Sequence, residues 1–287
     1  MTWSIEGKHI LITGGTTGIG RATATALAQM GANVTITSRN LASAATACEE
    51  IKRNSGTTVT PEEVDLSSLS SVRALAGRYE AEQRQIDVLI NNAGTMTARR
   101  QATPDGLEKT MAVNHFGPFL LTSLLLDRLI SRAPSRIITV SSENYRGAKQ
   151  GLDFDDLQLT TGFTPAKAYA ASKLANIVFT VELDRRFAGQ GITARALHPG
   201  VVATAFGTGP DSPKRMAIAM RLLKPFLATP AKGAATSVHV ATAPQADLEA
   251  GIYWSNQKPK QPSPVAIDAG AARRLWDVSS ALVGLAS

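Results

Sequence analysis

A tyrosine and a lysine stand four residues apart in the segment YAASKLAN, and together they could transfer a proton. The surrounding residues 165–189 are rich in helix formers, and their apolar members recur at helical spacing. Residues i and i+4 of a helix share one face, so Tyr169 and Lys173 should point in the same direction. The segment alone would equally suit an ordinary surface helix, so its interpretation depends on the rest of the chain.

A glycine-rich segment, TGGTTGIG, follows the first β-branched run of the chain. Glycines in such a turn let the backbone approach a pyrophosphate, and the N-terminus of the next helix offers free N–H groups to it. The spacing is GxxxGxG rather than GxGxxG, so a plain flexible turn is the alternative. Its place between a strand and a helix predicts a nucleotide site. The residues that would form this site are Gly14, Thr16, Thr17, Gly18, Ile19, Gly20 and Arg21.

Short β-branched segments alternate with longer helical patterns along the chain. Strands are expected in HILITG, NVTITS, TVTPEEVD, IDVLINN, SRIITVSS and ITARALHPG. Helices are expected between them, for example over residues 20–30 and 67–84. This alternation predicts an α/β fold, a doubly wound parallel sheet of the Rossmann type with helices on both faces. Such sheets bind ligands at the carboxyl ends of their strands.

Composition and charge narrow the function classes. The formal charge is +7, but the basic residues are scattered and no nucleic-acid module is recognisable, so we expect an anionic small ligand rather than nucleic acid. The lone Cys48 and the unpaired histidines predict neither a disulfide nor a metal site. The N-terminus lacks a signal-peptide pattern, and the longest apolar stretch, residues 116–130, is too short to span a bilayer. We therefore expect a soluble cytoplasmic protein.

The chain carries a specific set of motifs in one order: TGGTTGIG, NNAG at 91–94, a serine pair at 141–142, YAASK and HPG. This set resembles the short-chain dehydrogenase/reductases along essentially the whole chain. Further segments resemble the retinol-dehydrogenase-like branch, which includes the WW-domain oxidoreductase and the protochlorophyllide reductases. These segments are VNHFGPFLLT, DFDDLQ, SKLANIVFTVEL, HPGVVAT, GIYWSNQK and RRLWDVSS. The resemblance implies a single domain over residues 1–287, with a mainly cofactor-binding half at 1–140 and a catalytic and substrate-binding half at 141–287.

The resemblance further implies an oxidoreductase that interconverts an alcohol and an aldehyde or ketone. Tyr169 would exchange a proton with the substrate oxygen, and Ser142 would hydrogen-bond that oxygen. A free phenol has a pKa near ~10, and the Lys173 ammonium, together with the positive oxidised nicotinamide, would favour the phenolate. Lys173 would also hold the nicotinamide ribose, and Asn114 would support a water-linked proton path to this lysine.

Ordinary structural roles compete at several of these positions. Ser141 is as good a hydroxyl as Ser142 on sequence alone, and only the resemblance favours Ser142. Asn114 could simply cap or bend a helix, and His198 is expected to be structural rather than catalytic.

Contacts to the cofactor beyond the glycine-rich segment are implied by the resemblance. They would be made by Asp65, Leu66, Asn92, Ala93, Gly94, Pro199, Gly200, Val202 and Thr204. Here too there are alternatives, because Asp65 could cap a helix beginning at Ser67, NNAG could end a strand, and the Pro-Gly pair could form a turn.

The end of the second expected strand, in NVTITSRN, indicates which nicotinamide cofactor is used. An NAD-specific fold places a carboxylate there on the ribose 2′-hydroxyl, whereas this chain has Ser38 and Arg39. Arg39 could hold a 2′-phosphate with its planar fork of donors, assisted by Ser38, Thr16 and Arg21. We therefore predict NADP(H), with a solvated loop arginine as the alternative.

Two segments could wall a substrate pocket. The first is the long connection between Ser142 and Tyr169, and the second is the amphipathic, basic segment 205–229. Their apolar residues predict a bulky apolar alcohol, aldehyde or ketone as the substrate, although they could equally be core side chains. These residues are Phe154, Leu157, Leu159, Phe163, Phe206, Met216, Met220, Leu222 and Phe226. We expect the second segment to be a mobile lid rather than a segment that lies on a membrane surface. The sequence leaves open whether the protein forms a homo-oligomer.

Two other functions compete with this enzyme. One is an NADPH-binding regulatory or scaffold protein without turnover, and the other is a same-fold epimerase or dehydratase. The intact set Asn114, Ser142, Tyr169 and Lys173 argues against a scaffold. Enzymes of the second kind usually resemble longer sequences with a separate substrate region, which this chain lacks.

Overall fold

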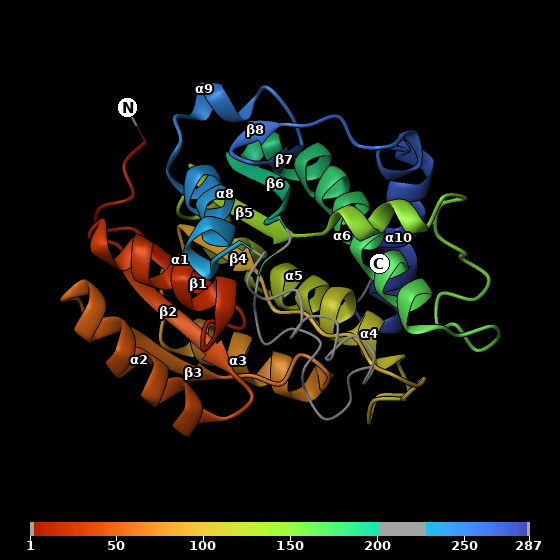
Figure 1. Ribbon diagram of the computed structural model, residues 1–287, viewed down its shortest axis with the longest axis horizontal. Coiled ribbons are helices and arrows are strands. Elements are labelled where there is room, and N and C mark those ends of the chain that lie inside the picture. The colour runs from red at the N-terminus through yellow and green to blue at the C-terminus, as the bar shows by residue number, and fades with distance from the viewer. Residues whose placement is uncertain (1–2, 201, 203–227, 286–287) are drawn as a thin grey trace.

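A mostly parallel eight-stranded sheet forms the centre of the computed structural model, which describes residues 3–200, 202 and 228–285. The strand order is β3-β2-β1-β4-β5-β6-β7-β8 (Figure 1). Neighbouring strands are parallel except β7 and β8, which pair antiparallel. The strands are β1 His9–Ile12, β2 Asn33–Ser38, β3 Thr60–Glu63, β4 Val88–Asn91, β5 Ser135–Val140, β6 Ile192–His198, β7 Tyr253–Ser255 and β8 Lys258–Pro259.

The connections between the strands are mainly helical. The longer helices are α1 Gly18–Gln29, α2 Leu41–Ser55, α3 Leu69–Ala81, α5 Gly117–Ile130, α6 Pro165–Phe187, α8 Pro230–Thr242 and α10 Ala269–Leu282. The shorter ones are α4 Lys109–Met111, η1 Ala112–Phe116, η2 Glu143–Gly147, η3 Ala188–Gln190, α9 Gln245–Leu248 and η5 Pro264–Ala266. Among the described residues, no helix combines the length and the apolar character needed to cross a membrane.

Two hydrophobic cores lie on opposite faces of the sheet, because successive side chains of a strand point in opposite directions. Leu11 belongs to the core under α3, α5, α6 and α10, whereas Ile10 and Ile12 belong to the core under α1, α2 and α8. Figure 1 shows these helices on the two sides of the sheet. The predicted doubly wound parallel sheet with helices on both faces is confirmed.

The β7–β8 hairpin is an element that the sequence pattern did not indicate. Its strands contain three and two residues, too few to display a period of two. The turn between them consists of Asn256 and Gln257, whose φ angles of 50° and 61° both lie in the left-handed region, as in a type I′ hairpin turn. Without glycine in the turn, the segment carries no strong hairpin signal.

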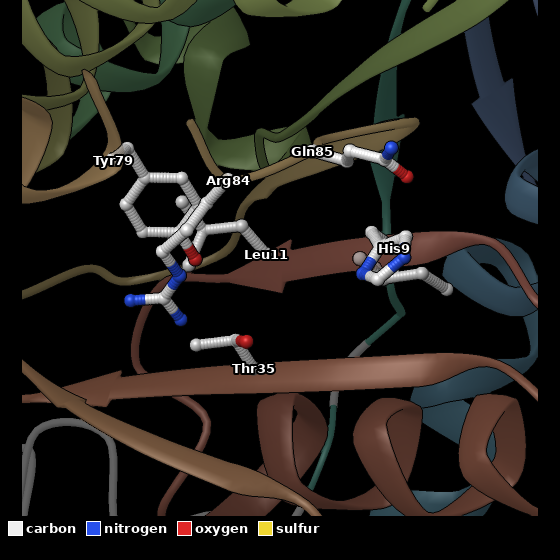
Figure 2. Close-up of a pocket in the computed structure, with 7 residues that line it drawn as sticks. His9, Leu11, Thr35, Tyr79, Arg84 and Gln85 are labelled. Carbon is white, nitrogen blue, oxygen red and sulfur yellow. The ribbon is translucent and has the colours of Figure 1, made fainter. Parts of the chain in front are cut away.

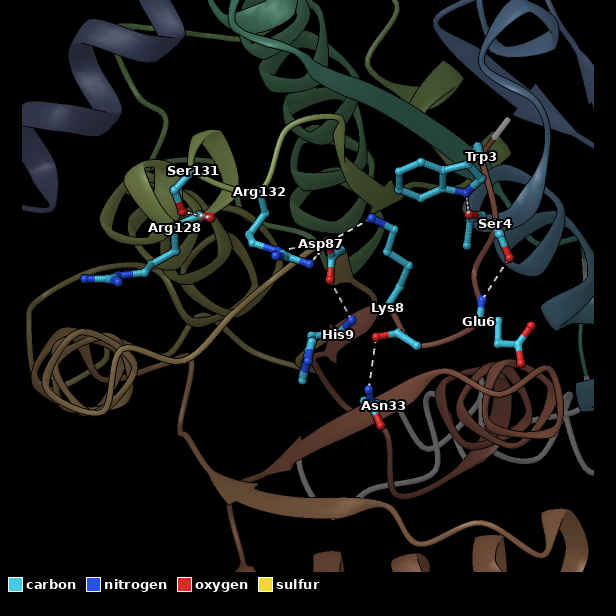
Figure 3. A network of polar contacts seen from close by, with 12 residues as sticks. Trp3, Ser4, Glu6, Lys8, His9, Asn33, Asp87, Arg128, Ser131 and Arg132 are labelled. Carbon is cyan, nitrogen blue, oxygen red and sulfur yellow. Dashed lines mark hydrogen bonds and ion pairs between the residues drawn. The ribbon is translucent and has the colours of Figure 1, made fainter. Parts of the chain in front are cut away.

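A buried carboxylate fixes the amino ends of the central strands (Figure 3). Asp87 accepts hydrogen bonds from the backbone N–H of His9 at 2.8 Å and from Lys8 Nζ and Arg132 Nη2, both at 3.1 Å. Nearby, Trp3 Nε1 donates to the carbonyl of Ala241 at 2.8 Å, which ties the start of the chain to α8. With this end of β1 and β4 held together, their opposite ends keep a fixed relation to each other.

Candidate active site

The chain reverses its direction of travel across the sheet between β3 and β4, so a crevice forms at the carboxyl ends of β1 and β4. The turn that leaves β1 lies here and needs glycine for two reasons. Gly14 adopts a φ of +67°, and a Cβ atom on it would lie 3.0 Å from Ala93. A Cβ atom on Gly20 would lie 2.5 Å from Asn92 Nδ2 and would also collide with the carbonyl of Gly14. The glycine-rich segment therefore packs directly against the NNAG segment.

The N-terminus of α1 can accept an anion. Among the described residues, no side chain caps this end, since its N-cap residue Thr17 makes no side-chain hydrogen bond to the first turn. By contrast, α2, α3, α6, α8 and α10 are each capped by a side-chain oxygen. Exposed N–H groups at a helix N-terminus bind phosphate groups, so this end of α1 fits a dinucleotide pyrophosphate.

Thr13 locks the two segments of this crevice together. Its hydroxyl accepts hydrogen bonds from the backbone N–H groups of Asn92 at 3.0 Å and Ala93 at 3.1 Å. The Asn92 amide in turn donates to the carbonyls of Thr13 and Gly14, at 2.9 and 3.1 Å. The sequence analysis missed Thr13, although it directly precedes the glycines of the glycine-rich segment.

Asn114 lies in η1, a π-helical turn inserted between α4 and α5. Its amide oxygen accepts from the N–H of Thr95 at 2.7 Å, and its nitrogen donates to the carbonyl of Thr95 at 3.0 Å and to Ser172 Oγ at 2.9 Å. π-Helical turns occur frequently at functional sites. Asn114 joins the segment after β4 to the helix that carries Tyr169. Thr95 and Ser172 were not singled out from the sequence.

Ser142, Tyr169 and Lys173 meet beyond the ends of β4 and β5. Tyr169 and Lys173 lie one turn apart on α6, with Lys173 Nζ 5.7 Å from the centroid of the tyrosine ring. The Tyr169 hydroxyl hydrogen-bonds the side chain of Ser142. Lys173 Nζ donates to the carbonyl of Val140 at 2.9 Å. A Cβ atom on the exposed Gly94 would lie 3.4 Å from Lys173 Nζ and 3.5 Å from Asn114 Oδ1, so this glycine leaves space beside both groups.

The two neighbouring serines point to different partners. Ser141 is buried, and its hydroxyl donates to the carbonyl of Lys173 at 2.7 Å. Ser142 is half buried, and its side chain is the one that reaches Tyr169. The geometry therefore separates two hydroxyls that the sequence alone left equivalent.

Burial dominates the electrostatics of the tyrosine and the lysine. It raises the pKa of Tyr169 to about 12, with the Ser142 hydrogen bond acting in the opposite direction. It also lowers the pKa of Lys173 to about 8. The expected effect of Lys173 together with the oxidised nicotinamide concerns the loaded site and stays a prediction, whereas burial is the largest influence on the pKa of Tyr169 in the unliganded chain. The unliganded site holds a neutral phenol at neutral pH.

The residues predicted to contact the adenine differ in what they can offer. Leu66 is only 5% exposed and packs in the core, so its side chain faces away from the crevice. Asp65 is half buried and accepts from the N–H of Ser67 at 2.9 Å. Its alternative role as the N-cap of α3 is wrong, because that role belongs to Ser68, whose side chain accepts from Ser71 N.

The HPG segment ends β6 beside the site. His198 Nδ1 accepts a hydrogen bond from the backbone N–H of Glu143 at 3.3 Å, and burial lowers its pKa, which agrees with a structural role. Gly200 has a φ of +86°, a left-handed conformation that favours glycine. Val202 is buried and pairs with Ala228 in an isolated bridge. Thr204 lies outside the described residues.

Two of the residues predicted to distinguish NADP(H) from NAD(H), Ser38 and Arg39, lie at the end of β2. Arg39 is exposed, and Ser38 Oγ accepts from the N–H of Asn40 at 3.2 Å. Arg21, at the start of α1, forms an ion pair with Glu50 of α2. The positive charge of Arg21 is thus already compensated within the chain, which leaves Arg39 as the main candidate for a 2′-phosphate.

The first predicted pocket wall is mostly core. Leu157 belongs to the core cluster that includes residues of α10, and Leu159 is 5% exposed. Phe154 packs against the same cluster, with the guanidinium of Arg274 4.6 Å from its ring centroid. Leu157 and Leu159 are buried, which favours the core alternative for these two residues, whereas Phe154 and Phe163 stay half buried. The residues of the second wall, Phe206, Met216, Met220, Leu222 and Phe226, lie outside the described residues.

Two cavities lie away from this constellation. A cavity of about 160 Å³ opens beside β1 and β2, where Arg84 stacks 4.2 Å from the ring centroid of Tyr79 (Figure 2). A larger one of about 640 Å³ lies between α1 and α8. The chemistry-bearing side chains Ser142, Tyr169 and Lys173 line neither cavity.

The constellation can transfer a proton to or from a small molecule bound beside Gly94. Tyr169 could supply the proton, the Ser142 side chain hydrogen-bonds its hydroxyl, and Lys173 and Asn114 border the space beside Gly94. The glycine-rich turn and the uncapped end of α1 fit the phosphates of a dinucleotide. Among the described residues, no group of three or more His, Cys, Asp or Glu is arranged to hold a metal ion.

The chain is similar to known proteins in both sequence and fold. Residues 8–153 match the short chain dehydrogenase family. Human retinol dehydrogenase 14 is 40% identical over 296 residues, covering 98% of this chain and 88% of that protein. A crystal structure of an uncharacterised protein from Mycobacterium paratuberculosis has a TM-score of 0.75 and 31% identity, covering 99% of this chain and 98% of that one. RhlG from Pseudomonas aeruginosa, in an active-site complex with NADP, has a TM-score of 0.64 and 26% identity, covering 84% of this chain and 91% of that one.

Proposed function

Because this chain belongs to the short chain dehydrogenase family, we propose that it is an NADP(H)-dependent oxidoreductase that interconverts an alcohol and an aldehyde or ketone. The observation that carries this proposal is the meeting of Ser142, Tyr169 and Lys173 beside Gly94, next to a crevice that fits a dinucleotide. Asn114 completes the set by tying α6 to the segment after β4. A scaffold protein would have no need of a buried proton donor aligned in this way.

The chain's own residues would bind the substrate oxygen and transfer its proton. In reduction, Tyr169 Oη gives its proton to the carbonyl oxygen, while Ser142 Oγ hydrogen-bonds the same oxygen. The bound cofactor supplies the hydride that goes to the carbonyl carbon. In oxidation Tyr169 must accept the hydroxyl proton, which requires the phenolate. The raised pKa of Tyr169, about 12, keeps the phenol protonated in the unliganded site, and this is the form that can donate a proton.

The cofactor would lie across the carboxyl ends of the strands. The glycine-rich turn and the N–H groups of α1 would hold the pyrophosphate, and Asn92, Ala93 and Gly94 would border the riboses. Lys173, whose Nζ lies beside Gly94, would hydrogen-bond the nicotinamide ribose. The choice of NADP(H) is supported by the exposed Arg39 at the end of β2, where no carboxylate is present to repel a 2′-phosphate.

Arg39→Ala tests this choice of cofactor. A charge-assisted hydrogen bond contributes roughly 1.5–3 kcal/mol, so we expect NADPH binding to weaken about tenfold or more while NADH binding barely changes. Fluorescence titration of each reduced cofactor measures the two dissociation constants. Arg53→Ala, an exposed arginine on α2, is the matched control and should affect neither cofactor. An equal loss for both cofactors, or a wild-type preference for NADH, would contradict the assignment.

The substrate is proposed to be a bulky, mostly apolar alcohol, aldehyde or ketone. The name of the 40% identical relative supports an apolar alcohol, whereas the first predicted wall supports it less, since Leu157 and Leu159 are core residues. A screen of alcohols and carbonyls with NADP(H) and NAD(H), read by nicotinamide absorbance, tests both the reaction and the substrate class. We expect the best efficiency with long-chain or polyene aldehydes. Better efficiency with sugar phosphates would contradict the proposed substrate class. No turnover of any compound would contradict the proposal that the protein is an oxidoreductase.

A cytoplasmic location remains a proposal. It is supported by the lone Cys48, which is buried and whose thiol pKa is raised to about 11 by burial, as suits a structural cysteine in a reducing compartment. Fractionation of cells that express the full chain would test the location and any contact with membranes. Sedimentation of the purified protein would decide between a monomer and a homo-oligomer.

A further inference from the structure

Glu143 directly follows Ser142 and gathers donors from two separate parts of the chain. Its carboxylate accepts from Tyr253 Oη of β7 at 3.0 Å, and it pairs with Lys260 Nζ at 2.9 Å and with Arg146 Nε at 3.1 Å. Burial would raise the pKa of this carboxyl, but the hydrogen bonds from Lys260, Arg146 and Tyr253 outweigh it and hold the pKa below its usual value. These four residues are called the Glu143 cluster below.

The Glu143 cluster links the two segments that border the reacting centre. Ser142 is the N-cap of η2, and its Oγ accepts from the N–H of Asn144 at 3.2 Å. The backbone N–H of Glu143 donates to His198, the residue before the predicted nicotinamide contacts Pro199 and Gly200. The Glu143 side chain ties this same turn to the β7–β8 hairpin. Movement of Glu143 would therefore move Ser142 and loosen the end of β6 together.

The stability of the fold does not explain why these groups gather here. The Lys260 and Arg146 side chains are 41% and 45% exposed, and exposed ion pairs contribute little to stability. A catalytic group, by contrast, can lose on the order of 100-fold in rate when it is misplaced by about 1 Å. A carboxylate that fixes the turn carrying Ser142 would thus matter more for the rate than for folding.

We propose that Glu143 is a positioning residue, which acts through Ser142 by anchoring its turn to Tyr253 and Lys260. This inference rests on the proposed function, because it assigns Ser142 the task of orienting the substrate oxygen. It adds to that site Glu143, a group outside the Asn114, Ser142, Tyr169 and Lys173 set, whose partner Tyr253 comes from a hairpin that the sequence pattern did not indicate.

The test is a double-mutant cycle of Glu143→Gln with Ser142→Ala, measured on the best substrate of the screen. Glu143→Gln should lower kcat about tenfold, with KM and the NADPH dissociation constant changed less than about twofold, since only the placement of Ser142 is lost. In the Ser142→Ala background the same change should cost nothing further, because the group through which it acts is absent. Effects that multiply, or a kcat within twofold of wild type, would overturn the proposal.

The controls separate positioning from folding. Glu182→Gln removes another carboxylate that pairs with two arginines, on α6 about 20 Å beyond Tyr169, and should leave kcat unchanged. If Glu143→Gln does not fold, Lys260→Met replaces it in the cycle, because this side chain is largely exposed. It should give the same pattern with a smaller loss, and additive losses would again overturn the proposal.

Hydrogen exchange distinguishes a failure of this inference from a failure of the proposed function. If the wild-type protein turns over no substrate in the screen, the proposed function is wrong. The anchoring role of the Glu143 cluster is then tested by the rate of amide hydrogen exchange alone. Faster amide exchange confined to residues 141–147 in Glu143→Gln, about tenfold or more, would uphold the anchoring of the serine turn. Unchanged exchange in this segment would overturn it.

Discussion

Tyr169→Phe is expected to lower kcat at least ~100-fold, the lower end of general acid–base catalysis. The variant removes only the hydroxyl that hydrogen-bonds Ser142, so the ring keeps its packing in the 8% exposed site. NADPH binding should therefore stay nearly unchanged. Steady-state kinetics and fluorescence titration measure the two quantities on the same preparation.

A matched tyrosine is available as the control. Tyr79 is also buried, and its hydroxyl hydrogen-bonds Thr35 at the cavity beside β1 and β2, away from the site (Figure 2). Tyr79→Phe should keep wild-type turnover. If Tyr169→Phe retains wild-type activity on any substrate, Tyr169 is not the proton donor and the mechanism proposed above is wrong.

Lys173→Met should abolish most of the turnover while making the unliganded protein more stable at pH 7. Burial lowers the pKa of Lys173 to about 8 from 10.5, so its ammonium is held in the folded state against a desolvation cost. After the substitution, the carbonyl of Val140 would still accept a hydrogen bond from Asn176 Nδ2, which lies 3.2 Å away. Removing the charge should stabilise the fold by on the order of 3 kcal/mol, because the pKa falls from 10.5 to about 8 and one pKa unit corresponds to about 1.4 kcal/mol.

The effect on stability has a defined dependence on pH. Between pH 8 and 10.5 the unfolded chain binds more protons at this lysine than the folded one, so the stability of the wild type rises with pH in this window. The advantage of Lys173→Met should therefore be full below pH 8, shrink as the pH rises and vanish above 10.5. Urea unfolding at pH 7 and at higher pH measures it.

An exposed lysine serves as the control for this prediction. Lys52→Met, on the surface of α2, should change neither turnover nor the dependence of stability on pH. A destabilised Lys173→Met at pH 7, or an advantage that does not depend on pH, would show that burial of the ammonium is not costly in this fold.

The sequence by itself determined the features that depend on local spacing. Tyr169 and Lys173 share a face because four residues make about one helical turn. The central strands β1, β4, β5 and β6 were recognisable from their apolar runs, since each buries a nearly continuous segment. The glycine-rich segment was recognisable because only glycine tolerates the φ of Gly14 and the close contact at Gly20.

The tertiary structure decided every feature that depends on contacts between distant parts of the chain. It placed Ser142 rather than Ser141 on Tyr169, gave Arg21 a partner in Glu50, and brought Tyr253 and Lys260 to Glu143. It moved Leu157 from a predicted pocket wall into the core, because α10 covers that connection.

The protonation state of the site shows most clearly why the sequence was insufficient. The sequence predicted that Lys173, together with the oxidised nicotinamide, would favour the phenolate, whereas in the unliganded chain burial raises the pKa of Tyr169 to about 12. A neighbouring charge can be read from the sequence, because it depends on residues four positions apart. Desolvation cannot, because it depends on all the atoms that the folded chain packs around the phenol.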